Sequence, residues 1–206
     1  FIGATGMWVH SMITLSSVLV SVLICFVIGV PLGVIASYNK WYRDIQNVVL
    51  DAMQTLPYFC YLIPVLMFFG GNIVSAVIAT VIYSVPPIIR LTALGLSQVS
   101  GSYSEVSKSF GGTGIQTLNK VKFPLAVPSL VMGFNQTVIM AFAMQIVTPL
   151  IGGKGLGLQV FNALQRSDTG RGLSAGLAIV LLAIIIDRIT HAWTKKQRQA
   201  LGLDKS

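Results

Sequence analysis

Very few residues of this 206-residue sequence have the types and spacing that a catalytic or metal-binding site requires. Its six acidic residues are scattered, and neither histidine, His10 or His191, has an acid or a cysteine at catalytic spacing. The stretch GGKGLG around Lys154 resembles a phosphate-binding loop, but Gly155 stands where such a loop requires Ser or Thr. We therefore expect no catalytic residue, no cofactor-binding residue and no metal ligand in this chain.

The two cysteines, Cys25 and Cys60, lie in separate apolar runs of the sequence. Neither has a second cysteine or a histidine at the spacing that a metal site needs. We expect both to be buried free thiols, which pack as small apolar side chains.

One polar segment interrupts long apolar stretches. The sequence SYSEVSKSFGGTGIQTLNKVKFP, residues 102–124, carries three lysines, one glutamate and three glycines. It predicts a short helix capped by Ser102 or Ser104, a joint at the glycines, and a second short amphipathic helix that runs into Pro124. Two such short helices cannot bury a core of their own, so the segment needs the surface of a partner.

Glu105 is the only acid of this segment. It can pair with a basic group of a partner, where an arginine would give a bidentate contact, or it can remain a solvated acid that contributes little. Gly111 permits the joint that sets the angle between the two short helices. Lys108, Lys120 and Lys122 either contact the partner or face solvent and lipid headgroups.

The composition places most of the chain in a membrane. Hydrophobic residues make up 54% of the sequence and charged residues only 10%, and the mean hydropathy is +0.78. A soluble domain carries roughly 25% charged residues. No charged residue precedes Lys40, none lies between Asp51 and Arg90, and none lies between Lys122 and Lys154. These gaps supply the roughly 20 apolar residues of a membrane-spanning helix, or a multiple of them.

The apolar pattern predicts an all-α polytopic membrane protein that forms a single transmembrane domain over residues 1–206. We expect five spans at about 11–37, 45–69, 73–96, 123–148 and 173–193. A tight turn lies at Gly70, Gly71 and Asn72, the polar loop covers about 100–122, and a Gly-rich loop covers 149–172. Prolines in or near the spans predict kinks that either serve packing or open a path between helices.

The basic residues give the orientation of the spans. Five spans place the two termini on opposite sides, and the 14 Lys and Arg residues then divide eleven to three. The larger group is Lys40, Arg43, Arg90, Lys108, Lys120, Lys122, Arg188, Lys195, Lys196, Arg198 and Lys205; the smaller is Lys154, Arg166 and Arg171. By the positive-inside rule, the polar loop and the C-terminus are cytoplasmic. Topology and anionic lipid account for the net charge of +8 without nucleic acid.

The polar loop resembles the cytoplasmic signature of importer-type ABC transporter permeases, which is Glu-Ala-Ala, three residues, Gly, nine residues, Ile, one residue, Leu-Pro. Here Glu105-Val106-Ser107 is followed after three residues by Gly111, and nine residues later by Val121-Lys122-Phe123-Pro124. The resemblance implies a MetI-like permease fold with five core helices and a cytoplasmic coupling helix. It also implies an ATPase-coupling role for Glu105, Ser107, Lys108, Gly111 and Pro124.

Within these permeases the chain is similar to those of glycine betaine/proline (compatible solute) uptake. The similarity lies in MQTLPYFCYLIPVLMFFG (53–70), VPPIIRLTALGLSQV (85–99), GFNQTVIMAFAMQIV (133–147), IGGKGLG (151–157) and AIIIDRIT (183–190). It implies a prokaryotic cell membrane, a second permease copy, two ATPase subunits that bind ATP and Mg, and an external binding protein or fused binding domain. The implied substrates are solutes such as glycine betaine, proline betaine, choline or carnitine.

Two other functions are compatible with the residues. One is an ABC permease for another small solute such as an amino acid, because selectivity in such systems lies largely in the binding protein. The other is a secondary transporter that works without ATP. The second is disfavoured because the spans contain no buried acid to carry a proton and no evident inverted repeat.

The fourth span offers a candidate translocation path. Met132, Gln136, Met140 and Met144 recur every four residues, and Asn135 lies beside them. Polarizable and dipolar groups suit a neutral zwitterion, because a fixed charge would trap one end of it and is costly in a membrane. The alternative is that the amides hydrogen-bond neighbouring helices and the methionines fill gaps.

Aromatic residues of the second and third spans are a further candidate. Tyr58, Phe59, Tyr61 and Tyr83 can offer ring faces to an ammonium group. The alternative is that they pack, as aromatic residues in membrane proteins commonly do.

Overall fold

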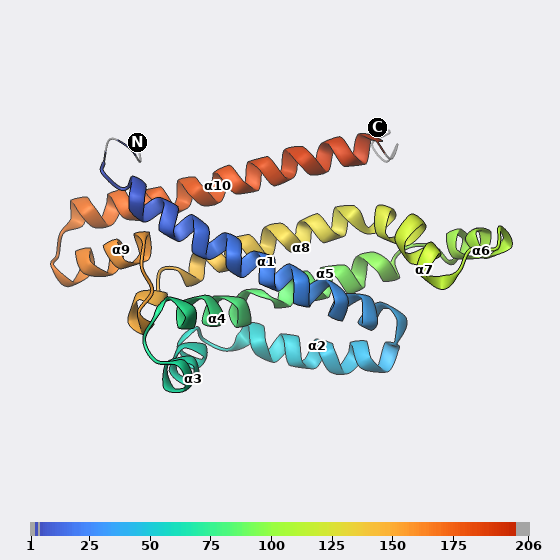
Figure 1. The fold of residues 1–206 in the computed structure, drawn as a ribbon, viewed down its shortest axis with the longest axis horizontal. Helices are drawn as coiled ribbons and strands as arrows, with labels where there is room; N and C mark the ends of the chain where they lie inside the picture. Colours follow the sequence, from blue (N-terminus) through green and yellow to red (C-terminus); the bar gives the residue numbers. More distant parts are fainter. Residues whose placement is uncertain (1–2, 4, 201–206) are drawn as a thin grey trace.

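Every regular element is helical in the part of the chain that the computed structural model describes (Figure 1). That part is residue 3 and residues 5–200, with the backbone alone for residues 193–200. The elements are α1 (Trp8–Tyr38), α2 (Lys40–Thr55), α3 (Phe59–Phe69), α4 (Ile73–Ser84), α5 (Pro86–Ser97), α6 (Gly101–Ser109), α7 (Gly114–Thr117), η1 (Leu118–Lys122, a π-helix), α8 (Phe123–Met144), η2 (Thr148–Ile151, a 3₁₀-helix), α9 (Leu156–Gln165) and α10 (Thr169–Ala200).

Among the described residues, four continuous stretches are long and apolar enough to cross a membrane: Trp8–Tyr38, Ile73–Ser97, Gly114–Met144 and Thr169–Ala192. The pair α2–α3 makes a fifth if it counts as one span. The predicted all-α, multi-span class is confirmed.

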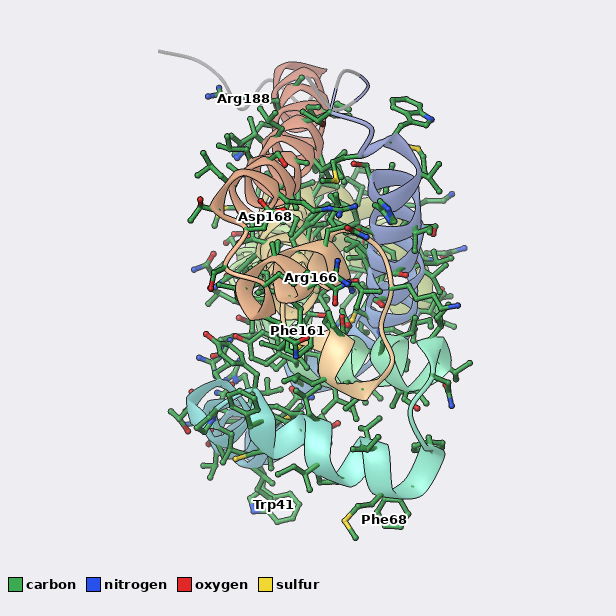
Figure 2. All side chains as sticks on the ribbon, turned by 90° about the vertical axis from the view of Figure 1, so that its left-hand side faces the viewer. Trp41, Phe68, Phe161, Arg166, Asp168 and Arg188 are labelled. Atoms are coloured by element: carbon green, nitrogen blue, oxygen red, sulfur yellow. The ribbon has the colours of Figure 1, made fainter. Side chains whose placement is uncertain are left out.

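The second predicted span, residues 45–69, is not one straight helix. Helices α2 and α3 meet at an angle of 94°. Pro57 gives the reason, because a residue before a proline is disfavoured in helical conformation, and Leu56 is extended with ψ 133°. Helix α3 therefore turns across the bundle. Figure 1 shows it nearly end-on, and Figure 2, viewed along the bundle, shows it lying sideways with Phe68 pointing outward.

The turn between α3 and α4 forms as the sequence predicts. Gly70 ends α3 with φ 72°, a conformation that glycine adopts without strain. Asn72 then caps α4, because its side-chain Oδ1 accepts a hydrogen bond of 2.9 Å from the backbone N–H of Ser75.

Helices α1 and α5 approach each other closely through two glycines of α1. Gly29 and Gly33 are four residues apart and so share one face of the helix. A Cβ on Gly29 would lie 2.5 Å from Cγ2 of Ile88, and a Cβ on Gly33 would lie 2.6 Å from Cβ of Thr92. The same Cβ on Gly33 would lie 2.7 Å from the backbone oxygen of Ile89. Such small-residue contacts let membrane helices gain dispersion energy at short range.

Helix α8 lies at the centre of the bundle and packs on α1, α4, α5 and α10. Against α5 it presents Ser129 to Gly95, where an added Cβ would lie 2.6 Å from Cβ of Ser129. On its other side Phe142 joins a buried cluster with Val18 of α1, Leu156 of α9 and Ile179 of α10. This position makes α8 the element through which the others are held together.

The Gly-rich stretch 149–172 is not a loop throughout, as the sequence led us to expect, because α9 forms within it. Hydrogen bonds tie α9 to α1: the N–H of Leu156 donates to Oγ1 of Thr14 at 2.8 Å, and Nε2 of Gln159 lies 3.1 Å from Nε2 of His10. Ten residues are too few for a span, so hydropathy does not reveal this helix. His10 is therefore a packing residue hydrogen-bonded between two helices.

The two cysteines differ in exposure. Cys25 is buried as expected, and its Sγ lies 3.4 Å from Oγ of Ser84. Cys60 is exposed, so the expectation of a second buried thiol is wrong. The reason is the break at Pro57, which turns α3 outward and presents this position to the outside of the chain.

The long helices give the molecule two ends (Figure 1). One end, which we call the coupling-loop end, carries the α1–α2 turn, α6, α7 and the C-terminal end of α10. The opposite end carries the start of α1, α9 and the α9–α10 turn, and Figure 2 looks onto it, with Arg166 and Asp168 in view. Lys40 and Lys108 lie at the first end and Arg166 lies at the second. Lys205 lies outside the described residues.

Candidate functional site

The polar loop folds into a compact knob at the coupling-loop end. Helix α6 ends at Ser109, and Gly111, two residues later, reverses the chain with a φ of 78°. The N–H groups of Gly111 and Gly112 donate to the carbonyls of Lys108 and Ser107 at 2.8 and 2.9 Å. Oγ of Ser107 also lies 2.8 Å from Oγ1 of Thr117, which fastens α6 to α7. Ser107 and Gly111 thus set the shape of the knob from within.

The start of α6 differs from the expectation. The helix begins at Gly101 with Ser100 at its N-cap and no side-chain cap, so capping by Ser102 or Ser104 is wrong. Oγ of Ser102 instead lies 2.6 Å from Oγ of Ser100. The clear cap is one helix later. Thr113 caps α7 in a capping box with Gln116.

The knob is joined to α8 without a break. From Gly114 the helix continues through η1 into Met144 as a single stretch of 31 residues. Pro124 is the second residue of α8, directly after the π-helical turn η1, and its missing N–H removes one helical hydrogen bond at this junction. Nζ of Lys122 lies 4.8 Å from the ring centroid of Tyr38 and so fixes η1 against the end of α1. The knob and the central helix α8 are therefore parts of one continuous helical stretch.

The outer surface of the knob is apolar as well as charged. Glu105 and Lys108 are exposed, and neither forms an ion pair with another described side chain. Four large apolar side chains of the same loop are also exposed: Tyr103, Val106, Phe110 and Ile115. Phe110 is the most open, with 88% of its surface accessible. We call these four residues the apolar knob patch.

Sequence reasoning missed the apolar knob patch because it looked for charge in a polar segment. The signal was available, since Phe110 and Ile115 flank the glycine joint at Gly111 and stand out among polar neighbours. Exposed apolar groups that protrude beyond the membrane spans mark a contact surface.

An ion pair connects α2 to α5 near the same end. Arg90 Nη2 lies 2.6 Å from Oδ1 of Asp51. The pair borders a cavity of about 420 Å³ that Arg43 and Asn47 also line. It holds α2 against the bundle before the break at Pro57, and no pattern in the sequence pointed to it.

The structure does not bring the five predicted path residues onto one face of α8. Met132 and Gln136 are exposed and Met140 is half-buried. Asn135 is buried with Oδ1 unpartnered, and Met144 is fully buried in a core cluster with Leu62 of α3. The reason is geometric. Residues four apart advance about 40° around a helix, so the stripe rotates by about 120° from its first member to its last.

Three of the four candidate aromatic residues meet. The ring centroid of Tyr83, in the last turn of α4, lies 5.4 Å from that of Tyr58 and 6.0 Å from that of Tyr61. Both contacts are edge-to-face. The hydroxyl of Tyr61 donates to the backbone oxygen of Met53 and so links α3 to α2 across the break. Phe59 is exposed and takes no part in the cluster.

The sequence over residues 29–199 matches the family described as the binding-protein-dependent transport system inner membrane component. The chain belongs to this family. It is therefore a multi-pass permease component of the inner membrane, consistent with the helical spans, and the matched range includes the knob and α8.

Two named permeases are similar to this chain over most of its length. The permease is 44% identical over 197 residues to the glycine betaine/proline betaine transport system permease protein ProW of Escherichia coli, covering 96% of this chain and 56% of the relative. It is 46% identical over 185 residues to the glycine betaine/carnitine transport permease protein GbuB of Listeria monocytogenes, covering 90% and 66%. The chain thus spans between about half and two thirds of the length of these relatives.

A solved structure shares the fold. The permease superposes on a chain of the inward-facing MetNI methionine ABC transporter with a TM-score of 0.77, covering 90% of this chain and 95% of the other. The two sequences are 23% identical, so the likeness concerns the fold alone.

Proposed function

We propose that this permease carries compatible solutes of the quaternary ammonium type into the cell. The observation that carries the proposal is its identity of 43–46% with three permeases named for glycine betaine. Solutes of this class include glycine betaine, proline betaine, choline and carnitine. An external binding protein or a binding domain on the same polypeptide delivers the solute to the end that carries α9.

The energy comes from partner ATPase subunits that bind ATP and Mg in the cytoplasm, and the knob is their docking element. The knob lies at the end with most of the basic residues, which the positive-inside rule makes cytoplasmic. Its exposed Glu105 and Lys108 offer charged contacts, and Phe110 offers an apolar anchor for a groove on the ATPase. Ser107, Gly111 and Pro124 act indirectly, because they shape the knob and its junction with α8.

Two copies of the permease form the translocation path. Gln136 is exposed in the middle of α8, and its amide makes no hydrogen bond to another described residue. An amide left without a partner in hydrocarbon costs roughly 1–3 kcal/mol. This face of α8, with Met132, Gln136 and Met140, is therefore directed to a second copy and the aqueous route between the copies rather than to lipid.

The proposed function is tested with the full-length permease, its ATPase subunits and its binding protein reconstituted in proteoliposomes. We expect uptake of labelled glycine betaine that requires both internal ATP and the binding protein. Uptake without ATP would identify a secondary transporter. ATP-dependent uptake of an amino acid in preference to glycine betaine would assign the permease to another solute class.

Replacing Gln136 by Glu is expected to lower uptake about tenfold while binding-protein-stimulated ATPase activity is retained. A fixed carboxylate would hold the ammonium end of the solute and is costly at membrane depth. Gln136→Leu removes the amide without adding charge and should lower uptake only a few-fold. Both variants are compared for uptake and ATPase activity in the reconstituted complex. Parallel loss of uptake, ATPase activity and assembly would instead assign Gln136 to packing between the two copies.

A further inference from the structure

The break in the second span brings three tyrosines together from separate parts of the chain. Tyr58 lies at the break itself, Tyr61 lies in the first turn of α3, and Tyr83 lies in the last turn of α4. The ring planes of Tyr58 and Tyr83 meet at 67° with centroids 5.4 Å apart. Two rings at such an angle form a corner in which a rounded group can touch aromatic surface on two sides.

The corner lies well inside the membrane. Tyr83 is the eleventh residue of the 25-residue span Ile73–Ser97, close to its midpoint. The segment that interrupts the second span, residues 56–58, is exposed and non-helical. Irregular backbone does not face lipid at this depth, because nothing there can satisfy its polar groups. The break and the adjoining rings therefore face water or another protein surface.

The accessible aromatic surface belongs to Tyr58 and Tyr83. Tyr58 is 43% exposed and Tyr83 is half-buried, whereas Tyr61 is only 8% exposed. The ring of Tyr61 packs against that of Tyr83, and its hydroxyl donates a hydrogen bond to the backbone oxygen of Met53. It is a positioning residue that fixes the corner across the break.

No acidic side chain is available to neutralise a cation in this stretch, since the sequence has no charged residue between Asp51 and Arg90. The ring faces can stabilise a cation in this stretch, because the negative face of an aromatic ring attracts quaternary ammonium groups. Such groups cannot donate hydrogen bonds, so they suit a site made of aromatic surface. A site without a fixed anion also binds the solute weakly, so that the solute can leave the site during transport.

We propose that Tyr58 and Tyr83 form a transient cation–π binding site for the quaternary ammonium group of the solute as it crosses the membrane. The inference rests on the proposed function, which supplies the ligand class, and adds a place where this chain recognises it. Each ring face is expected to contribute about a fivefold to tenfold effect on uptake.

The test compares Tyr58→Phe with Tyr58→Leu, and Tyr83→Phe with Tyr83→Leu, in the complete reconstituted transporter. Uptake of labelled glycine betaine and binding-protein-stimulated ATPase activity are both measured. We expect the Phe variants to stay within about twofold of wild type and the Leu variants to lose about tenfold in uptake with ATPase activity retained. Phe68→Leu is the matched control, because Phe68 lies at the far end of α3 and points away from the bundle.

Fluorinated phenylalanines at position 58 give a second measurement that keeps ring size and folding. Each added fluorine weakens the negative ring face, so uptake should fall stepwise with fluorine number. Three results would overturn the proposed cation–π site but leave the proposed function standing. They are equal uptake by the Phe and Leu variants, a joint loss of uptake and ATPase activity, and no trend with fluorination. A wild-type complex that fails to take up glycine betaine would overturn both.

Discussion

Replacing Phe110 by Asp is expected to abolish solute uptake although the permease still folds and inserts. Phe110 is 88% exposed at the C-terminal end of α6 and belongs to none of the buried clusters of the described residues, so its replacement leaves the fold intact. A buried aromatic anchor at a protein interface typically contributes about 2 kcal/mol or more, and a carboxylate in its place adds a desolvation cost. We therefore expect at least a thirtyfold loss of uptake, measured together with co-purification of the ATPase subunits.

The matched control is Phe110→Leu, which keeps an apolar side chain at the same position and should retain most of the uptake. Glu105→Arg reverses the charge on the exposed face of α6 and should also weaken ATPase association. If Phe110→Asp and Glu105→Arg both transported at the wild-type rate with ATPase subunits bound, the knob would not be the docking element.

Replacing Gly33 by Val is expected to prevent stable folding of the permease. A Cβ at this position would lie 2.6 Å from Cβ of Thr92 and 2.7 Å from the backbone oxygen of Ile89. A side-chain rotation cannot relieve a contact with backbone, so α1 and α5 must separate. Overpacking costs typically 1–3 kcal/mol, and the loss of close helix contact adds to it. The measurements are the yield of monodisperse protein in detergent and its unfolding temperature.

Gly176→Ala is the control for this prediction, because Gly176 also lies in a membrane-spanning helix but an added Cβ there would meet nothing within 4 Å. It should leave yield and unfolding temperature unchanged. A Gly33→Val protein with wild-type yield and thermal stability would mean that the two helices are not as close as the structure places them.

The polar loop of residues 100–122 shows how much of a fold the local sequence can predict. The spacing of Glu105, Gly111 and Pro124 predicted two short helices around a glycine joint, and the joint exists because Gly111 adopts a φ of 78°. That outcome depends on residues adjacent in the chain. The exposure of Phe110 and Ile115 does not, since it follows from how the knob projects beyond the bundle.

The predictions for the second span and for α9 were wrong because hydropathy windows contain neither the direction of a segment nor its distant contacts. Hydropathy gives the length of apolar sequence but not its direction, so the bend of 94° at Pro57 was read as a kink in one span. Helix α9 is held in place by contacts with α1 more than 140 residues earlier, such as that between Leu156 and Thr14. Sequence windows do not contain such contacts.

Residue types were enough to predict a helical protein that spans a membrane several times and carries a polar loop at its basic end, because apolar side chains enter a membrane favourably and charged ones enter it at a cost. The tertiary structure, in contrast, sets which side chains share a surface. It buried Met144, left Gln136 exposed, and brought Tyr58 and Tyr83 together across 25 residues of chain. Met144 is buried because it packs with Leu62 of α3, and Tyr58 meets Tyr83 because α3 lies against α4. Both contacts join residues that are distant in the chain, so sequence windows do not contain them.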